Sequence, residues 1–260
     1  MGYLLIELNN MYALIRMRAS IQTAAYFLFM AVCPALYPIT AGTVASLALL
    51  AALFFLFRSY QKGISSSDLF YTFLCIGTGS LIFPQLTYFV PVFWIGAYLF
   101  QSLHPKSFFA SILGWGLPFW LLLAHAYFHG QMELFRHPFT ELTTFTSVNF
   151  RFQPWEIATL SYLLLLFITS GTHCLIAGYE DKIRTRSYLQ FIILYTGYTF
   201  LYIVLQPAMC IFLLPILILG ISILTGHLFV LTNNRSSNYF FIFMLINLCM
   251  LFCYNVWTLF

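Results

Sequence analysis

The side chains best suited to chemistry gather in one polar stretch, residues 129–154. It brings together carboxylates, guanidinium groups and imidazoles: Glu133, Glu141, Arg136, Arg151, His129 and His137, with His125 just before it and Glu156 just after. A carboxylate can serve as a general base when its environment tunes its pKa, and arginine can clamp a phosphate through two parallel hydrogen bonds. We therefore expect an acid/base or anion-binding cluster, with Glu141 as its catalytic residue and with substrate-binding residues Arg136, Arg151, His137, His129 and His125. The alternative is a solvated loop whose charges face water.

A pair of histidines precedes this cluster. His125 and His129 are four residues apart and share one face of a continuous helix, with Glu133 one turn further, which is a ligand-like spacing. However, Gly130 favours helix termination directly after His129, and a termination there removes Glu133 from that face. A metal site and a simple pair of interfacial histidines both stay open at this point. We predict no bound metal and no cofactor.

The surrounding sequence is that of a membrane protein. The chain is 62% hydrophobic, 20% aromatic and only 7% charged, whereas an ordinary soluble domain has about 25% charged residues. A soluble fold of this size cannot bury so much apolar surface, but a bilayer removes that requirement. The net charge of +4 is dispersed among short connectors without a basic block, so nucleic acid is not an expected partner.

Hydrophobic runs predict an all-α, polytopic transmembrane bundle in a single integral membrane domain over residues 1–260. An interfacial helix is expected over residues 1–19 and an external loop over residues 129–154. About nine spans are expected, at residues 21–39, 41–57, 69–83, 86–101, 107–128, 155–178, 188–206, 208–231 and 238–260. Alanines recurring through 41–57 form a small-residue stripe, which is typical of close helix packing in membranes.

Positive charges predict the orientation. With nine alternating spans, nine lysines and arginines lie on one side and only Arg136 and Arg151 lie on the other. The positive-inside rule then places the N-terminus in the cytoplasm, and residues 129–154 and the C-terminus outside. The same alternation separates His125, His129 and His137 from His104, His173 and His227, so a single six-histidine iron site is not expected. All six cysteines fall in or beside apolar runs, which favours packing over redox or metal roles.

Two apolar segments carry a resemblance to glycosyltransferases. One segment is residues 77–100, GTGSLIFPQLTYFVPVFWIGAYLF, which resembles the hairpin of polytopic GT-C type glycosyltransferases. The other is residues 113–130, LGWGLPFWLLLAHAYFHG, which resembles the span that follows this hairpin in those enzymes. Over residues 9–127 the chain also resembles an uncharacterised polytopic inner-membrane protein family of Bacteroidota, some of whose members are mislabelled carotene oxygenase, in the runs NNMYALIRMRAS and ALFFLFRSYQK. The resemblance implies sugar transfer from a polyprenyl-phosphate donor at the external face.

The sequence departs from the transferase pattern at one important place. GT-C type enzymes carry a catalytic acid in their first external loop, but residues 37–42 contain none. Either helices that precede this position are missing from the chain, or it is not a working transferase. Our leading hypothesis is a multi-pass protein of the bacterial inner membrane that handles a lipid-linked saccharide or polyprenyl-phosphate, with membrane lipids as its surroundings. The alternatives are a non-enzymatic scaffold or subunit that docks a membrane or envelope protein, and a transporter or flippase, for which the spans offer amides but no central charge.

Overall fold

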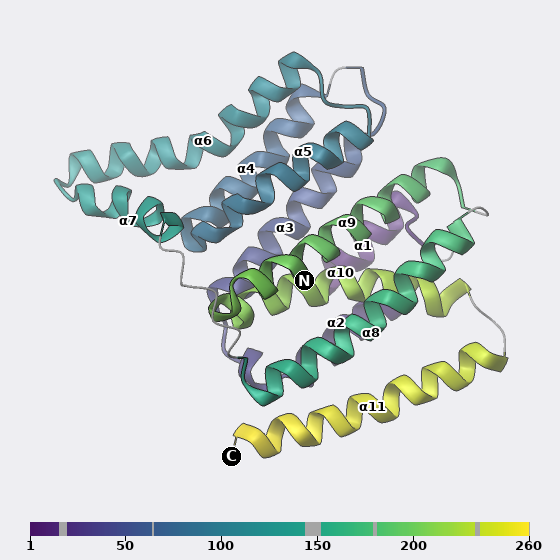
Figure 1. The fold of residues 1–260 in the computed structure, drawn as a ribbon. Coiled ribbons are helices and arrows are strands. Elements are labelled where there is room, and N and C mark those ends of the chain that lie inside the picture. Colours follow the sequence, from purple (N-terminus) through teal and green to yellow (C-terminus); the bar gives the residue numbers. More distant parts are fainter. Residues whose placement is uncertain (16–19, 64, 144–151, 179–180, 232–234, 260) are drawn as a thin grey trace. The chain divides into compact units, whose positions relative to one another are not determined.

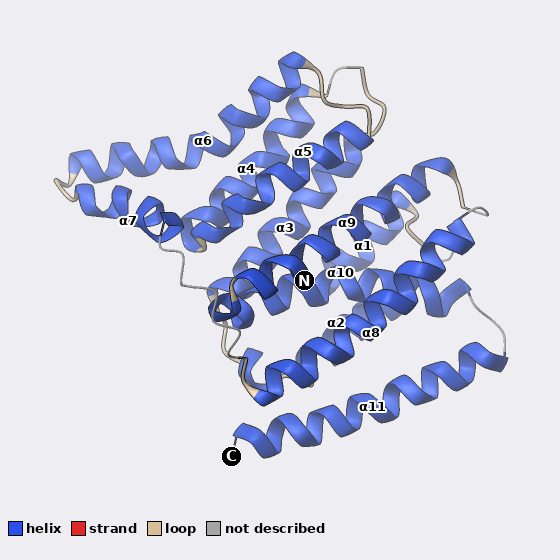
Figure 2. Cartoon of the chain, viewed as in Figure 1, coloured by secondary structure: helices blue, strands red, loops and turns tan. Residues whose placement is uncertain are grey.

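The computed structural model describes residues 1–15, 20–63, 65–143, 152–178, 181–231 and 235–259, and every regular element among them is helical (Figures 1 and 2). The all-α prediction is therefore confirmed. The α-helices are α1 Gly2–Tyr12, α2 Ile21–Ala31, α3 Ala41–Arg58, α4 Ser66–Ile82, α5 Val90–Leu99, α6 Pro105–Phe128, α7 Met132–Thr143, α8 Pro154–Ala177, α9 Ile183–Leu205, α10 Cys210–Leu231 and α11 Arg235–Leu259. Short 3₁₀-helices begin at prolines: η1 Pro34–Leu36, η2 Pro84–Phe89 and η4 Pro207–Met209.

Six helices in the described part of the chain are long and apolar enough to cross a bilayer. Their apolar spans are Ala41–Arg58, Pro105–Phe128, Pro154–Ile176, Ile183–Leu205, Pro207–Leu231 and Ser237–Thr258. The shortest has 18 residues and so measures about 27 Å, close to the roughly 30 Å hydrocarbon core of a bilayer. These helices indicate a multi-pass integral membrane protein.

The other three predicted spans form shorter helices. Residues 21–39 give α2 with 11 residues, 69–83 give α4 with 17, and 86–101 give η2 followed by α5 with 10. Prolines end α2 and α4, because a residue before proline is driven out of the helical region. Cys33 before Pro34 has φ −109° and ψ 89°, and Phe83 before Pro84 has φ −131° and ψ 88°. Nine spans and the orientation of the termini remain predictions.

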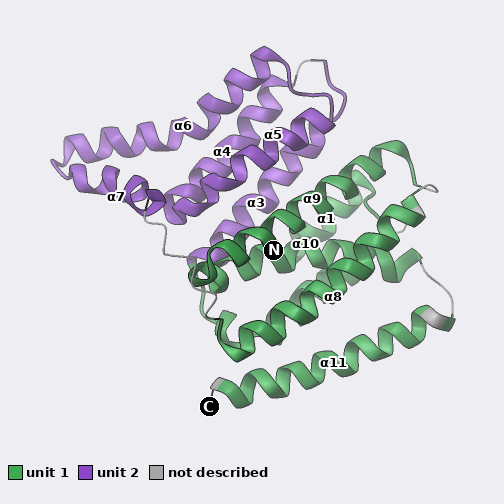
Figure 3. Ribbon diagram, viewed as in Figure 1, with its two compact units in different colours: residues 1–40, 148–260 green, residues 41–147 purple. Residues whose placement is uncertain are grey.

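The chain divides into two compact units (Figure 3). Unit 1 is discontinuous in sequence and comprises Met1–Thr40 and Val148–Phe260, whereas unit 2 is the continuous segment Ala41–Ser147. Unit 2 contains α3 to α7, and unit 1 contains α1, α2 and α8 to α11.

Unit 2 is held together by very close helix packing. A Cβ atom built on Gly77 of α4 would lie 2.6 Å from the Trp115 carbonyl oxygen of α6, and one on Gly114 of α6 would overlap the Phe70 carbonyl oxygen of α4. On the other side of α4, a Cβ on Gly79 would lie 2.8 Å from the Cβ of Ala48 in α3. Small residues therefore let three backbones approach, as is common where lipid provides no hydrophobic driving force. The predicted packing role of the alanine stripe is confirmed at Ala48.

Two connectors meet at one end of unit 2. The Gln61 backbone N–H donates to the Phe100 carbonyl at 2.9 Å, and the Ser65 hydroxyl donates to the Ser102 carbonyl at 2.6 Å. The start of α4 therefore lies beside the end of α5, so the two helices run antiparallel. This arrangement is what two crossings at 69–101 require, although both helices are shorter than a full span.

Basic side chains gather at the same end of unit 2. Arg58 and Lys62 bind the buried carboxylate of Asp68 at 2.6 and 2.9 Å, and Lys106 follows the α5–α6 connector. The opposite end of α6 leads into α7.

Unit 1 is built around α10. This helix packs against α2, α8 and α9, and 78% of its most apolar window is buried. A Cβ on Gly226 would lie 2.8 Å from the Gln22 side chain of α2, and the Gln22 amide donates to the Leu5 carbonyl of α1 at 2.6 Å. Leu5 and Leu8 of α1 are fully buried, so one face of the predicted interfacial helix belongs to the core of this unit.

Candidate functional site

Residues 129–154, predicted as an external loop, contain the helix α7. Its residues divide into two stripes at helical spacing: the polar side chains Glu133, Arg136, His137, Thr140 and Glu141, and the apolar side chains Phe135, Pro138, Phe139 and Leu142. Such a division is typical of an amphipathic helix. The predicted external loop therefore contains a helix, and its position outside the membrane stays a prediction.

The apolar stripe anchors α7 to the rest of unit 2. The Tyr88 hydroxyl in η2 donates to the Leu142 carbonyl at 2.8 Å. The Phe139 ring packs against Phe119 of α6 with centroids 5.4 Å apart, and Pro138 is buried. Figure 1 shows α7 running back beside the end of α6. The polar stripe is left on the exposed side.

The histidine pair lies at the end of α6 and not on α7. α6 ends at Phe128, and Gly130 adopts the left-handed conformation with φ +65°, so the predicted helix termination is confirmed. The His125 and His129 rings are in tilted contact, with centroids 4.4 Å apart and an interplanar angle of 55°, and both are exposed. Glu133 begins the next helix and is removed from their face. Among the described residues, no group of three or more histidine, cysteine, aspartate or glutamate side chains has the geometry of a metal site.

The polar stripe brings together three of the six predicted site residues: Arg136, His137 and Glu141. Nε2 of His137 lies 3.4 Å from Oε1 of Glu141, and the two side chains are 69% and 40% exposed. Arg136 occupies the same stripe and is exposed. Arg151 lies outside the described residues. An imidazole beside a carboxylate can take up a proton, and the neighbouring guanidinium can hold an anion.

A second polar cluster was not found by sequence reasoning. Sγ of Cys174 in α8 lies 3.3 Å from Nδ1 of His227 in α10, and Nε2 of the same ring lies 3.0 Å from Oδ2 of Asp181 in the connector before α9. We call these three residues the thiol triad. Cys174 and Asp181 are 3% and 7% exposed, and His227 is fully buried. Cys174 was predicted only to pack, and in the structure it also contacts His227 at hydrogen-bonding distance.

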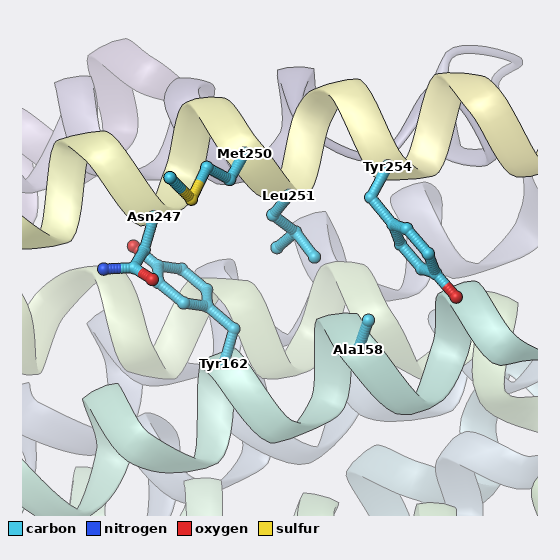
Figure 4. A pocket seen from close by; sticks show the side chains of 6 residues that line it. All are labelled: Ala158, Tyr162, Asn247, Met250, Leu251 and Tyr254. Carbon is cyan, nitrogen blue, oxygen red and sulfur yellow. The ribbon is translucent and has the colours of Figure 1, made fainter.

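Unit 1 also contains a lateral cavity. It has a volume of about 320 Å³, lies between α8 and α11, and is lined by Ala158, Tyr162, Asn247, Met250, Leu251 and Tyr254 (Figure 4). The Tyr162 hydroxyl donates to the Met244 carbonyl at 3.1 Å, and the Asn247 amide donates to the Phe243 carbonyl within its own helix. Its lining contains no charged group, so it could hold an apolar group but offers a ligand few polar contacts.

Comparisons with known proteins do not assign a family. The sequence matches no protein-family profile, no curated protein and no solved structure. The residues and geometry of the chain itself therefore support the functional argument.

Proposed function

We propose that this chain is a multi-pass protein of the bacterial inner membrane that binds a lipid-linked anion at the polar stripe of α7. The expected ligand is a polyprenyl-phosphate or the saccharide linked to it, in keeping with the resemblance of residues 77–100 to the GT-C hairpin. One observation supports the proposal most strongly: His137 and Glu141 form a 3.4 Å pair beside Arg136 on the exposed face of an anchored amphipathic helix.

The position of α7 suits a lipid headgroup. An amphipathic helix buries its apolar face at the boundary between acyl chains and headgroups, and its polar face then lies at the depth of lipid phosphates. The apolar stripe of α7 is held by the Tyr88 hydrogen bond and the Phe119–Phe139 contact, which keeps the polar stripe turned away from the rest of unit 2. A substrate with a long lipid tail needs no enclosed pocket, because the bilayer already restricts it to this depth.

The charge distribution of unit 2 favours the external face. Arg58, Lys62 and Lys106 lie at the end opposite to α7, while α7 itself contributes the single cation Arg136. Cytoplasmic connectors carry the excess of lysine and arginine in membrane proteins. By this rule the α7 end faces outward.

The side chains suit glycosyl transfer. Arg136 would hold the donor phosphate, and the hydroxyl oxygen of the acceptor would attack the anomeric carbon. As that bond forms, the bond between the anomeric carbon and the phosphate oxygen breaks, and polyprenyl phosphate leaves. The proton of the acceptor hydroxyl would pass to Glu141, with His137 beside it to share the charge.

The test measures binding of undecaprenyl phosphate to the purified chain in lipid nanodiscs. Arg136→Ala should weaken binding about tenfold or more, since a hydrogen bond to a charged group contributes about 1.5–3 kcal/mol. Lys106→Ala removes the same charge from an exposed position at the opposite end of unit 2 and serves as the matched control. Glu141→Gln should leave phosphate binding intact and abolish transfer of a lipid-linked sugar.

Two results would contradict the proposal. Equal binding by the Arg136→Ala and Lys106→Ala variants would show that the polar stripe is not a phosphate site. A photo-crosslinker at Thr140 that captures one protein and never the lipid would instead support the scaffold alternative, in which α7 docks a membrane or envelope partner.

A further inference from the structure

We propose that the thiol triad is a second, catalytic site, at which Cys174 accepts a long-chain acyl group from an acyl thioester that has an anionic carrier. The site belongs to unit 1 and is independent of the function proposed for α7. Its three residues come from three separate segments, α8, the connector before α9, and α10.

The hydrogen-bond pattern is that of an activated nucleophile. The His227 ring lies between a thiol and a carboxylate and uses both of its nitrogens, at 3.3 Å to Sγ of Cys174 and 3.0 Å to Oδ2 of Asp181. A neutral ring satisfies both contacts when Nε2–H donates to the carboxylate and Nδ1 accepts from the thiol. A base within reach of a nucleophile, oriented in turn by a third group, is the arrangement that thiol and hydroxyl enzymes share.

Packing alone is a poor explanation for the triad. Burying polar groups costs free energy even when they are hydrogen-bonded, and an apolar set of the same volume is often as stable. The other buried cysteines, Cys33 and Cys210, form no hydrogen bond with a histidine in the described part of the chain, and they illustrate the ordinary packing role of this residue type.

A neighbouring side chain adds an independent sign of a ligand. Nδ1 of His173 is buried and has no hydrogen-bond partner among the described residues, and the His173 ring lies 6.0 Å from the His227 ring. A buried polar atom without a partner is unfavourable, so a group that is bound only during function would relieve it. The carbonyl oxygen of an acyl substrate is an acceptor of the required kind.

The location of the triad selects an amphipathic substrate. Cys174 lies in the last turn of α8, His227 lies one turn before the end of α10, and Asp181 precedes α9 by two residues. The apolar spans therefore begin on one side of the triad, and a basic segment, formed by the connector before α9 and the first turn of α9, lies on the other. Its exposed or half-buried cations are Lys182, Arg184 and Arg186. A fatty-acyl thioester with a phosphate-bearing carrier has the same order of parts: chain, carbonyl, anion.

The chemistry balances without a further reactant. His227 takes the proton of the Cys174 thiol, and the thiolate attacks the carbonyl carbon of the thioester. The new carbon–sulfur bond forms as the bond to the carrier sulfur breaks, and the carrier thiolate leaves with the proton from His227. Asp181 is a positioning residue that holds the ring with Nδ1 toward the thiol. The product is an S-acyl group on Cys174, ready for transfer to an acceptor.

The experiment incubates the full chain in nanodiscs with an alkyne-tagged palmitoyl coenzyme A and locates hydroxylamine-sensitive label by mass spectrometry. Label is expected at Cys174 and not at Cys249 or Cys253, which are exposed and report uncatalysed acylation. His227→Gln should slow the reaction 10²- to 10⁴-fold, the usual effect of losing a general base. Asp181→Asn should slow it less, and Asp181→Glu should restore part of the rate because it keeps the negative charge.

Wild-type protein provides a second measurement that does not depend on the folding of variants. Cys33 and Cys174 are 1% and 3% exposed, so a membrane-permeant maleimide meets similar barriers at both. Faster alkylation of Cys174, by tenfold or more, is expected if His227 activates its thiol. Equal alkylation of the two thiols, or label spread evenly over Cys174, Cys249 and Cys253, would overturn the catalytic site. Fast alkylation without acyl transfer would overturn the acyl-thioester substrate.

Discussion

Two glycines in α6 provide a sharp test of how unit 2 is packed. Replacing Gly114 by alanine places a methyl group against the carbonyl group of Phe70 in α4, and the atoms that it would meet are backbone atoms that cannot rotate away. Replacing Gly116, two residues further along the same helix, places the same methyl group where nothing lies within 4 Å. The two variants have identical composition and differ only in the side of α6 that they alter.

The contacts set the expected free energies. A carbon and a carbonyl oxygen rest at about 3.3–3.6 Å, so α4 and α6 must separate by roughly 1 Å around Gly114→Ala. Overpacking of this kind costs about 1–3 kcal/mol. In the Gly116→Ala variant the methyl group meets no neighbour, so the main effect is the higher helix propensity of alanine. This propensity stabilises the folded state by up to about 1 kcal/mol. The free energies of unfolding should therefore differ by about 2 kcal/mol, with Gly114→Ala the less stable.

The measurement is unfolding of the purified chain in mixed micelles by increasing SDS, followed by circular dichroism. Gly77→Ala provides a second copy of the close contact, since its methyl group would lie 2.6 Å from the Trp115 carbonyl oxygen. Its midpoint should fall with that of Gly114→Ala, while the midpoint of Gly116→Ala should equal or exceed that of wild type. If all three variants unfold at the same SDS fraction, α4 and α6 do not pack through their backbones.

Two further perturbations test the ends of unit 2. Tyr88→Phe removes the hydrogen bond to the Leu142 carbonyl, which contributes about 0.5–1.5 kcal/mol. Amide hydrogen exchange should rise in α7 and stay unchanged in α3, whereas equal exchange in α7 before and after the change would refute the anchoring role. Asp68→Asn leaves Arg58 and Lys62 beside a neutral amide and should lower the free energy of unfolding by about 1–3 kcal/mol. An unchanged SDS midpoint would show that these two ion pairs do not stabilise unit 2.

The helical framework could be predicted from the sequence where apolar runs are long and uninterrupted. α8 to α11 follow from such runs and from the prolines and polar connectors between them. The predicted spans 21–39, 69–83 and 86–101 contain or adjoin Pro34 and Pro84, whose local backbone effect ends a helix even inside an apolar run. The average hydrophobicity of a sequence segment does not reveal this effect of a single proline.

The candidate site on α7 was predicted by residue type and not by shape. Charge density selected Glu141, Arg136 and His137, and the structure places them on one stripe. The signal that identifies the helix was also present, in the spacing of Phe135, Phe139 and Leu142. The hydrogen bond from Tyr88 could not be foreseen, since its partner lies 54 residues further along the chain.

The thiol triad shows the harder limit. Cys174 and Asp181 lie 53 and 46 residues from His227, and each is unremarkable within its own segment. Sorting histidines by membrane side placed His173 and His227 at the same face. To predict which of these histidines contacts Cys174, one must know how α8 packs against α10. That packing depends on many apolar side chains at once. The one local hint was an adjacent histidine and cysteine at the end of a span.

The discontinuity of unit 1 has a consequence for biosynthesis. Residues Met1–Thr40 leave the ribosome first, but α2 packs against α10, where Gly226 meets Gln22. At 5–20 residues per second, the early helices wait on the order of ten seconds or more for that partner. The whole of Ala41–Ser147 is synthesised during the delay and can assemble meanwhile. Insertion factors that shelter unpaired helices should therefore hold α1 and α2 the longest, and chains stopped before α10 should be preferred targets of membrane proteases.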